Sequence, residues 1–188
     1  SLWLNGQYFT DVGSYYWAEK HIHYVSQKGW MTGRTSTTFS PDTFLTRAQG
    51  AVILIRALGK DNLKPKEYHF NDLNEGFWAK DEIEIARELG YLDGKTPHRF
   101  DPNAPLTRGQ LAKILYQIFD YTAVENVESI FADVSSEDYF LQPVMAIYQK
   151  GYINGYNDGT FGPYNPSKRS HMAKLMDLMS EDIEAIKK

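Results

Sequence analysis

The sequence contains no cysteine in its 188 residues. Disulfide bonds, thiolate metal sites and cysteine nucleophiles are therefore excluded. No apolar stretch in it approaches the roughly 18 residues that a membrane-spanning helix needs, so we expect no membrane insertion. A basic stripe is also missing, and the net charge of −4 at pH 7 argues against a nucleic-acid partner.

Catalytic and metal-binding signatures are missing as well. The five histidines do not follow a metal-binding spacing, and there is neither a Gly-x-Ser-x-Gly elbow nor a phosphate-binding glycine loop. We therefore expect no metal site, no cofactor and no enzymatic activity. Paired carboxylates of a glycoside hydrolase stay open as an alternative, because 24 acidic residues always give chance pairs.

The composition that is present is that of a globular protein. Apolar residues make up 42% and charged residues 23% of the chain, and aromatic residues are frequent at 14%. Residues 1–5 lack the basic and then apolar pattern of a signal peptide, so we expect a mature or trimmed start.

The strongest pattern is an internal repeat. Residues 45–49, Leu-Thr-Arg-Ala-Gln, return at 106–110 as Leu-Thr-Arg-Gly-Gln and at 167–171 as Ser-Lys-Arg-Ser-His, a shift of 61 residues each time (106 − 45 and 167 − 106). A fixed period outranks other sequence signals, and it defines a first, second and third copy at 9–59, 70–120 and 131–181. The identical triples at this shift are Phe9/Phe70/Phe131, Asp11/Asp72/Asp133, Gly29/Gly90/Gly151, Gly33/Gly94/Gly155, Phe39/Phe100/Phe161, Pro41/Pro102/Pro163, Arg47/Arg108/Arg169 and Ala51/Ala112/Ala173.

Each copy is expected to form two helices joined by a glycine-containing loop. We predict helices beginning near residues 17, 46, 78, 107, 139 and 168, with Gly29 and its equivalents ending the first helix of each copy. The second helices are the more apolar and should pack at the centre, with the first helices outside. The sequence predicts a mainly α, three-lobed bundle with pseudo-threefold symmetry, whose repeats span 1–60, 61–121 and 122–188. We expect the isolated unit to be monomeric.

An arginine opens the second helix of each copy. Thr46 with Gln49, and Thr107 with Gln110, form the pattern of a capping box, in which side chains and backbone at a helix start satisfy each other. The arginine that follows is a cation beside the free N–H groups and positive dipole of that helix start. This position is unfavourable unless an anion shares it, which makes the arginines candidate ligand contacts. The alternative is that each arginine pairs with a repeated aspartate.

The other repeated residues allow two interpretations each. Asp11, Asp72 and Asp133 can cap the following helix or contact a ligand. Trp17 and Trp78 can belong to the core or form a platform for a sugar ring. Gly33, Gly94 and Gly155 can serve a turn or let the backbone approach a ligand.

The ordered motifs Phe-x-Asp-Val, Trp-Ala, Gly-x-x-x-Gly, Phe-x-Pro and Thr-Arg-Ala-Gln closely resemble the S-layer homology (SLH) domain family, in three tandem copies over nearly the whole chain. The resemblance implies an extracellular anchor on a bacterial cell surface. It implies non-covalent binding of an anionic secondary cell-wall polysaccharide, through its terminal pyruvylated N-acetylmannosamine, in grooves between lobes. By the family's pattern Arg47, Arg108 and Arg169 meet the ligand's carboxylate. Gln49, Gln110 and His171 stand where the family usually has glutamate.

Two other functions stay open: a scaffold for protein interaction or self-assembly at the cell surface, and a wall-active hydrolase. Within the leading hypothesis we expect unequal sites. The third copy replaces the threonine cap, the tryptophan and the glutamine with Lys168, Tyr139 and His171, so the site of Arg169 is predicted to be the weakest.

Overall fold

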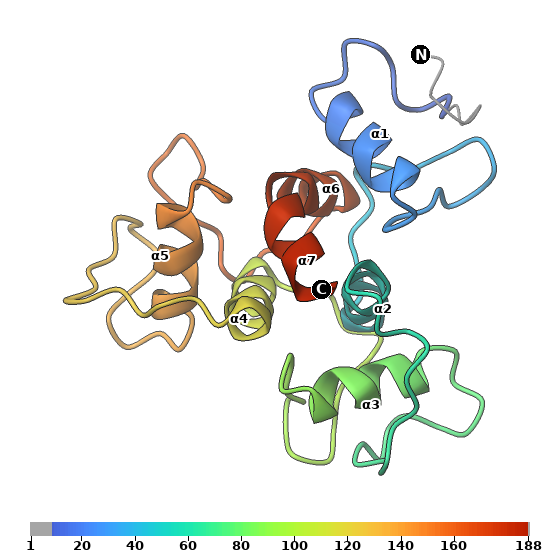
Figure 1. Cartoon of the computed structure of the whole chain (residues 1–188). Helices are drawn as coiled ribbons and strands as arrows, with labels where there is room; N and C mark the ends of the chain where they lie inside the picture. The colour runs from blue at the N-terminus through green and yellow to red at the C-terminus, as the bar shows by residue number, and fades with distance from the viewer. Residues whose placement is uncertain (1–8, 188) are drawn as a thin grey trace.

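A computed structural model describes residues 9–187, so the start of the chain, expected to be mature or trimmed, lies outside the described residues. Within this range the chain is helical, and only isolated β-bridges connect extended residues. Figure 1 shows three lobes around a central group of helices. The helices are α1 (Glu19–Gln27), α2 (Arg47–Ala57), α3 (Lys80–Glu88), α4 (Arg108–Phe119), α5 (Leu141–Gln149), α6 (Arg169–Leu178) and α7 (Ser180–Lys187).

The second helix of each copy lies at the centre and the first helix lies outside, as predicted (Figure 1). Each outer helix packs on the central helix of the preceding copy: α3 on α2, α5 on α4 and α1 on α6. One buried cluster accordingly joins Ala51 and Ile55 of the first copy to Phe70, Ile83 and Phe100 of the second. A lobe is therefore built from two successive copies, because neither copy covers its own apolar face.

Three equivalent backbone hydrogen bonds close the molecule around its pseudo-threefold axis. The N–H of Leu45 donates to the carbonyl of Ser167 (2.9 Å), that of Ser167 to Leu106 (2.8 Å), and that of Leu106 to Leu45 (2.9 Å). The first copy thus contacts the last directly. The closed arrangement that the equal spacing predicted is confirmed.

The helix starts follow the predicted positions to within two residues. Both capping boxes are present, with Thr46 and Thr107 as N-caps, whereas Lys168 makes no side-chain cap. The outer helices begin two residues later than expected, after N-caps Ala18 and Ala79 without side-chain caps, because the preceding residues form turns. Gly29 adopts φ 72° just after α1, which confirms it as a helix stop.

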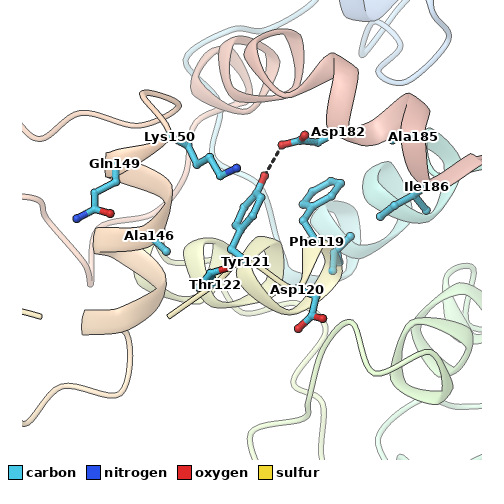
Figure 2. Close-up of a pocket in the computed structure, with 11 residues that line it drawn as sticks. Phe119, Asp120, Tyr121, Thr122, Ala146, Gln149, Lys150, Asp182, Ala185 and Ile186 are labelled. Atoms are coloured by element: carbon cyan, nitrogen blue, oxygen red, sulfur yellow. Dashed lines mark hydrogen bonds between the residues drawn. The ribbon is translucent and has the colours of Figure 1, made fainter. Parts of the chain in front are cut away.

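The sequence-based prediction missed α7. Ser180-Glu181-Asp182 has the polar start and acidic first turn typical of a helix N-terminus, but these residues lie where the repeat ends. Ile183 is buried in the core, and the Asp182 carboxylate accepts hydrogen bonds from the hydroxyls of Tyr121 (2.7 Å) and Tyr152 (3.0 Å). Figure 2 shows the Tyr121 bond beside a cavity of about 690 Å³. Burial and this carboxylate raise the pKa of Tyr152 to about 12.

Candidate functional site

Three arginines occupy equivalent buried positions and reach into the next copy. Arg47, Arg108 and Arg169 are only 6%, 8% and 7% exposed. Their Nε atoms donate to the carbonyls of Phe100, Phe161 and Phe39, each at 2.9 Å. Their Nη2 atoms donate to the carbonyls of Asp93 (3.4 Å), Asn154 (3.3 Å) and Thr32 (2.6 Å). Each guanidinium therefore connects two copies.

The free N–H groups expected beside these arginines are not free. The N–H of Arg47 donates to the carbonyl of Ala104 (2.9 Å), and that of Ala48 to Pro102 (3.0 Å). The equivalent bonds occur at the starts of α4 and α6. The Phe-x-Pro loop of the next copy thus satisfies each helix start. The expectation that an anion would use these backbone donors is wrong, because lobe closure supplies carbonyl partners that no single copy contains.

The alternative, an ion pair between each arginine and a repeated aspartate, is also absent. Between residues 9 and 187 no carboxylate pairs with Arg47, Arg108 or Arg169. Instead, the guanidinium carbons lie 4.6, 4.6 and 4.5 Å from the ring centres of Phe100, Phe161 and Phe39. Burial lowers the pKa of all three, that of Arg169 to about 10. Each is a desolvated cation in direct contact with dipoles and a ring, while the repeated aspartates Asp72, Asp133 and Asp11 oppose the lowering of the pKa without forming an ion pair with it.

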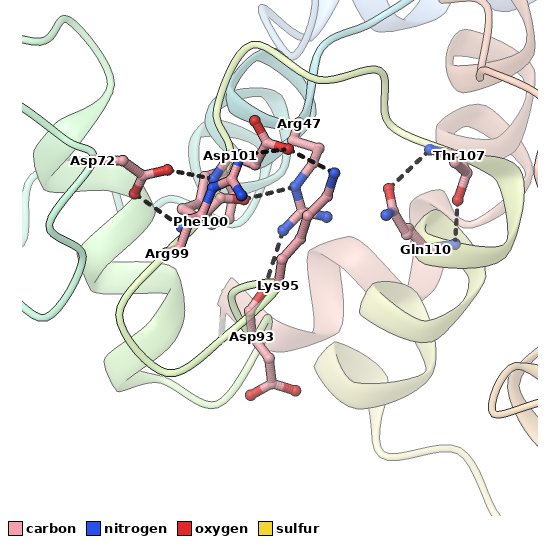
Figure 3. Close-up of polar contacts among 9 residues, drawn as sticks. All are labelled: Arg47, Asp72, Asp93, Lys95, Arg99, Phe100, Asp101, Thr107 and Gln110. Carbon is pink, nitrogen blue, oxygen red and sulfur yellow. Dashed lines mark hydrogen bonds and ion pairs between the residues drawn. The ribbon is translucent and has the colours of Figure 1, made fainter.

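The repeated aspartates hold the loop that precedes each central helix. Asp72 accepts from the N–H groups of Phe100 (2.9 Å) and Asp101 (2.7 Å), as Figure 3 shows. Asp11 and Asp133 make the same pair of bonds in their copies. The interpretation of Asp11, Asp72 and Asp133 as caps of the outer helices is wrong, because these helices begin about eight residues later, beyond the reach of the carboxylate. The aspartates fix the carbonyl that receives the arginine Nε.

The repeated glycines Gly33, Gly94 and Gly155 are required by packing. A Cβ on Gly94 would overlap with the ring of Phe70 and with the carbonyl oxygens of Thr96 and Arg99. Gly33 and Gly155 meet the equivalent Phe9 and Phe131. Gly94 also lines the cavity described next, and the approach of its backbone to a ligand stays a prediction.

A cavity of about 440 Å³ lies beside Arg47. Its wall comes from all three copies: Arg47 from the first, Lys95 and Gln110 from the second, and Tyr139 from the third. We call this set, with Asp93 and Lys113 of the same wall, the Arg47 site. Sequence reasoning grouped the residues by copy and therefore matched the arginines with the wrong aromatic residues.

The shift of 61 residues defines the Arg108 and Arg169 sites in the same way. At this shift, the position of Tyr139 in the Arg47 site corresponds to Trp17 in the Arg108 site and to Trp78 in the Arg169 site. In the Arg108 site the ring of Trp17 lies 5.5 Å from that of His171. Trp17, Trp78 and Tyr139 are 52%, 56% and 58% exposed. They are surface rings rather than core residues, as a sugar platform requires.

The Arg47 site contains acids that the other two sites lack. Lys113 pairs with Asp93 (3.5 Å) and Lys95 pairs with Asp101 (2.6 Å). Asn154 and Gly162 take the two aspartate positions around Arg108, and Thr32 and Ser40 take them around Arg169. Arg34 stands at the position of Lys95. The pKa of Arg169 is lowered mainly by burial and, to a smaller extent, by the positive charge of Arg34. An alignment of the copies at the shift of 61 contains these differences, but they lie at positions outside the identical triples on which the sequence-based prediction of the sites depended.

His171 gives the Arg108 site a titratable group. Burial lowers its pKa below 6.5, and the positive charges of Arg108, Lys168 and Lys174 lower it further. Gln49 and Gln110, at the same position of the other copies, instead use Oε1 to accept from the N-cap N–H (3.0 Å each). The side chain in the third copy is thus released from capping, and its ring lies tilted against that of Trp17.

Residues 9–187 contain no group of three or more histidines and acids arranged to hold a metal ion. Within the same residues no helix has both the length and the apolar character to cross a membrane.

Known proteins resemble this chain over most of its length. An endoglucanase of Bacillus sp. (strain KSM-635) is 35% identical over 181 residues, which is 91% of this chain and 18% of that protein. The S-layer protein EA1 of Bacillus anthracis is 28% identical, covering 93% and 20%. The surface-layer 125 kDa protein of Lysinibacillus sphaericus is 27% identical, covering 96% and 15%. This chain therefore spans at most a fifth of these relatives, and an enzyme's name gives it no catalytic assignment.

The family comparison identifies the repeat itself. The sequence model of the S-layer homology domain matches residues 8–51, 69–112 and 130–173, once in each copy. Together with the surface-layer relatives, this indicates a cell-surface or cell-wall location. The chain belongs to the S-layer homology domain family, as three tandem domains closed around one axis.

Proposed function

We propose that this chain is a non-covalent cell-surface anchor that binds an anionic secondary cell-wall polysaccharide, through a pyruvylated terminal N-acetylmannosamine, at the Arg47, Arg108 and Arg169 sites. One observation carries the proposal. Each of the three guanidiniums is buried against a backbone carbonyl and a phenylalanine ring, and no carboxylate within residues 9–187 forms an ion pair with it. A ligand carboxylate would supply a directly paired counter-charge at a partly desolvated position, where a charged hydrogen bond is strong.

The wall of each site supplies the remaining contacts. Nε of each arginine is occupied by a carbonyl, so the ligand would meet the outer edge of the guanidinium. The exposed ring of Tyr139, Trp17 or Trp78 would pack on the apolar face of a sugar. Gln110 lines the Arg47 cavity, and its amide group can bond hydroxyls beyond its capping role. In this proposal the repeated aspartates and glycines position the loop rather than touch the ligand.

A sedimentation assay with purified cell walls tests the proposal. The chain should pellet with untreated walls and remain in solution after mild acid has removed ketal-linked pyruvate. The physical reason is that the net charge of −4 leaves attraction of an anionic polymer to the local arginines. Equal pelleting with treated walls would contradict the anion requirement. Release of sugars from the walls would favour the hydrolase alternative instead.

A further inference from the structure

A second kind of surface site lies outside the arginine sites, at the start of α3. A cavity of about 500 Å³ is bounded by the linker that contains Asp61, Lys64 and Tyr68 and by the turn and first helical residues from Glu75 to Glu82. Its volume is within the range of small-ligand sites. We infer that this cavity, the α3 cavity, binds an uncharged or amine-bearing saccharide unit.

Two exposed aromatic rings from separate segments flank the α3 cavity. Trp78 is 56% exposed and Tyr68 is 54% exposed. Rings exposed to this extent leave apolar surface in contact with water, and the C–H face of a sugar can cover it while the edge groups bond to polar side chains. Two such rings on one cavity therefore indicate a saccharide more than a small ion.

The Tyr68 ring is held in place without a ligand. Its hydroxyl donates to Oδ1 of Asp81 (2.8 Å), and the Lys80 ammonium lies 4.6 Å from the ring centre. Lys64 contacts the other oxygen of Asp81 (3.4 Å). A platform that is already fixed loses little side-chain freedom on binding.

Charge separates the α3 cavity from the arginine sites. Four carboxylates and two ammonium groups line it, a net charge of −2. The carboxylates are Asp61, Glu75, Asp81 and Glu82, and the ammonium groups are Lys64 and Lys80. An anionic sugar would be repelled, whereas hydroxyl, acetamido and ammonium groups find acceptors. The α3 cavity therefore takes neutral or cationic sugars, whereas the arginine sites take anionic ones.

The side chains that hold the Tyr68 ring at the α3 cavity do not recur at the equivalent positions of the other copies. The positions equivalent to Tyr68, Lys80 and Asp81 are Ser129, Leu141 and Gln142 in the third copy, and Gln7, Glu19 and Lys20 in the first. Trp78 nevertheless belongs to both kinds of site, because its equivalent Tyr139 lines the Arg47 cavity. A glycan whose acidic terminal sugar binds at Arg169 would thus extend over Trp78, and its following sugar units would lie near Tyr68. Only this last step rests on the proposed function.

Titration of the isotope-labelled chain with defined trisaccharides, followed by backbone amide NMR, tests the inference. The probes are maltotriose, the trimers of N-acetylglucosamine and of glucosamine, and trigalacturonic acid. At least one neutral or amine-bearing probe should shift amides within residues 61–82 saturably, and trigalacturonic acid should not. Tyr68→Ala should weaken that binding on the order of three- to tenfold, and Tyr68→Phe less.

The matched control is Tyr15→Ala, which removes a fully exposed tyrosine far along the chain from the linker and should leave the affinity unchanged. No shift within 61–82 with any probe, or equal affinity of Tyr68→Ala while its amide spectrum stays folded, would overturn the inference. Arg169→Lys separates the two proposals: it should leave the trisaccharide shifts at 61–82 intact while weakening an acidic wall fragment. If Arg169→Lys leaves both the trisaccharide shifts and the affinity for the acidic wall fragment unchanged, the result counts against the proposed function and not against the α3 cavity.

Discussion

The Arg47 and Arg169 sites share one scaffold and differ in charge. In both, Nε of the arginine donates to a phenylalanine carbonyl at 2.9 Å and the guanidinium lies over that phenylalanine ring. Around Arg47, the cations Lys95 and Lys113 are already paired with carboxylates. Around Arg169, Arg34 replaces Lys95 and no acid takes the place of Asp93 or Asp101.

This difference favours the opposite order of site strengths from the one predicted from sequence. The weak site was assigned to Arg169 because the third copy lacks a threonine cap, a tryptophan and a glutamine. By the shift of 61 residues, the positions that line the Arg47 cavity as Tyr139 and Gln110 correspond to Trp78 and to Gln49, the latter at the capped start of α2, in the Arg169 site. The substituted residues Tyr139 and His171 fall instead into the Arg47 and Arg108 sites. We now propose that the Arg169 site binds an anionic glycan most tightly and the Arg47 site least.

The largest expected effect is the loss of affinity on changing Arg169. Arg169→Lys removes forked donors while keeping the charge, and a charged hydrogen bond is worth about 1.5–3 kcal/mol, or roughly ten- to a hundredfold in affinity. Arg47→Lys should cost several-fold less. Calorimetric titration with one pyruvylated oligosaccharide measures both, with Arg87→Lys as the control outside the sites. A larger loss for Arg47→Lys in folded protein would restore the order predicted from sequence.

The next largest effect is a gain in affinity for the anionic oligosaccharide at the Arg47 site when its two acidic side chains are removed. Asp93→Asn copies Asn154, and Asp101→Gly copies Gly162, whose φ of 68° matches the 62° of Asp101. In a chain that also carries Arg108→Lys and Arg169→Lys, the pair should raise affinity about three- to tenfold by freeing Lys113 and Lys95. Titration with the same oligosaccharide checks this. Unchanged affinity would show that charge pairing does not distinguish the sites.

A smaller effect concerns the third central helix. Lys168→Thr with His171→Gln would give α6 the capping box that α2 and α4 have. We expect a gain of about 1 kcal/mol in the free energy of unfolding, measured by urea denaturation. The control is Lys168→Ala with His171→Gln, which removes the same charges without providing a cap. Equal stability of the two variants would mean that capping does not limit α6.

The smallest effect is a pH dependence specific to the Arg108 site. The pKa of His171 is lowered in the folded chain, mainly by burial, so the unfolded chain binds the proton first. Its contribution to stability is complete above pH 6.5, the ordinary pKa, and is lost as pH falls through the lower folded value. His171→Gln should therefore lose less stability than the parent between pH 7.5 and 5.5 in urea denaturation. Equal losses would contradict this.

The sequence by itself determined the features that depend on neighbouring residues. The period of 61 can be read directly from the residues. The capping boxes at Thr46 and Thr107 and the stop at Gly29 involve bonds within one turn of chain, so their residues lie close together in sequence. Even α7 had such a local signal at Ser180. Closure of the three lobes also followed, because gap-free copies with short linkers favour equal packing around one axis.

The tertiary structure decided which residues meet in each site. Arg169 bonds to Phe39 across 130 positions of the sequence, and Asp72 binds backbone groups 28 and 29 residues away. The Asp72 contact needs the loop of its own copy to fold back, whereas the Arg169 contact exists only once the third copy packs on the first. The repeat pattern is the same whichever copy supplies the partner of each arginine. Closure therefore determines which aromatic ring and which acids surround each arginine, and with them the charge that a ligand meets.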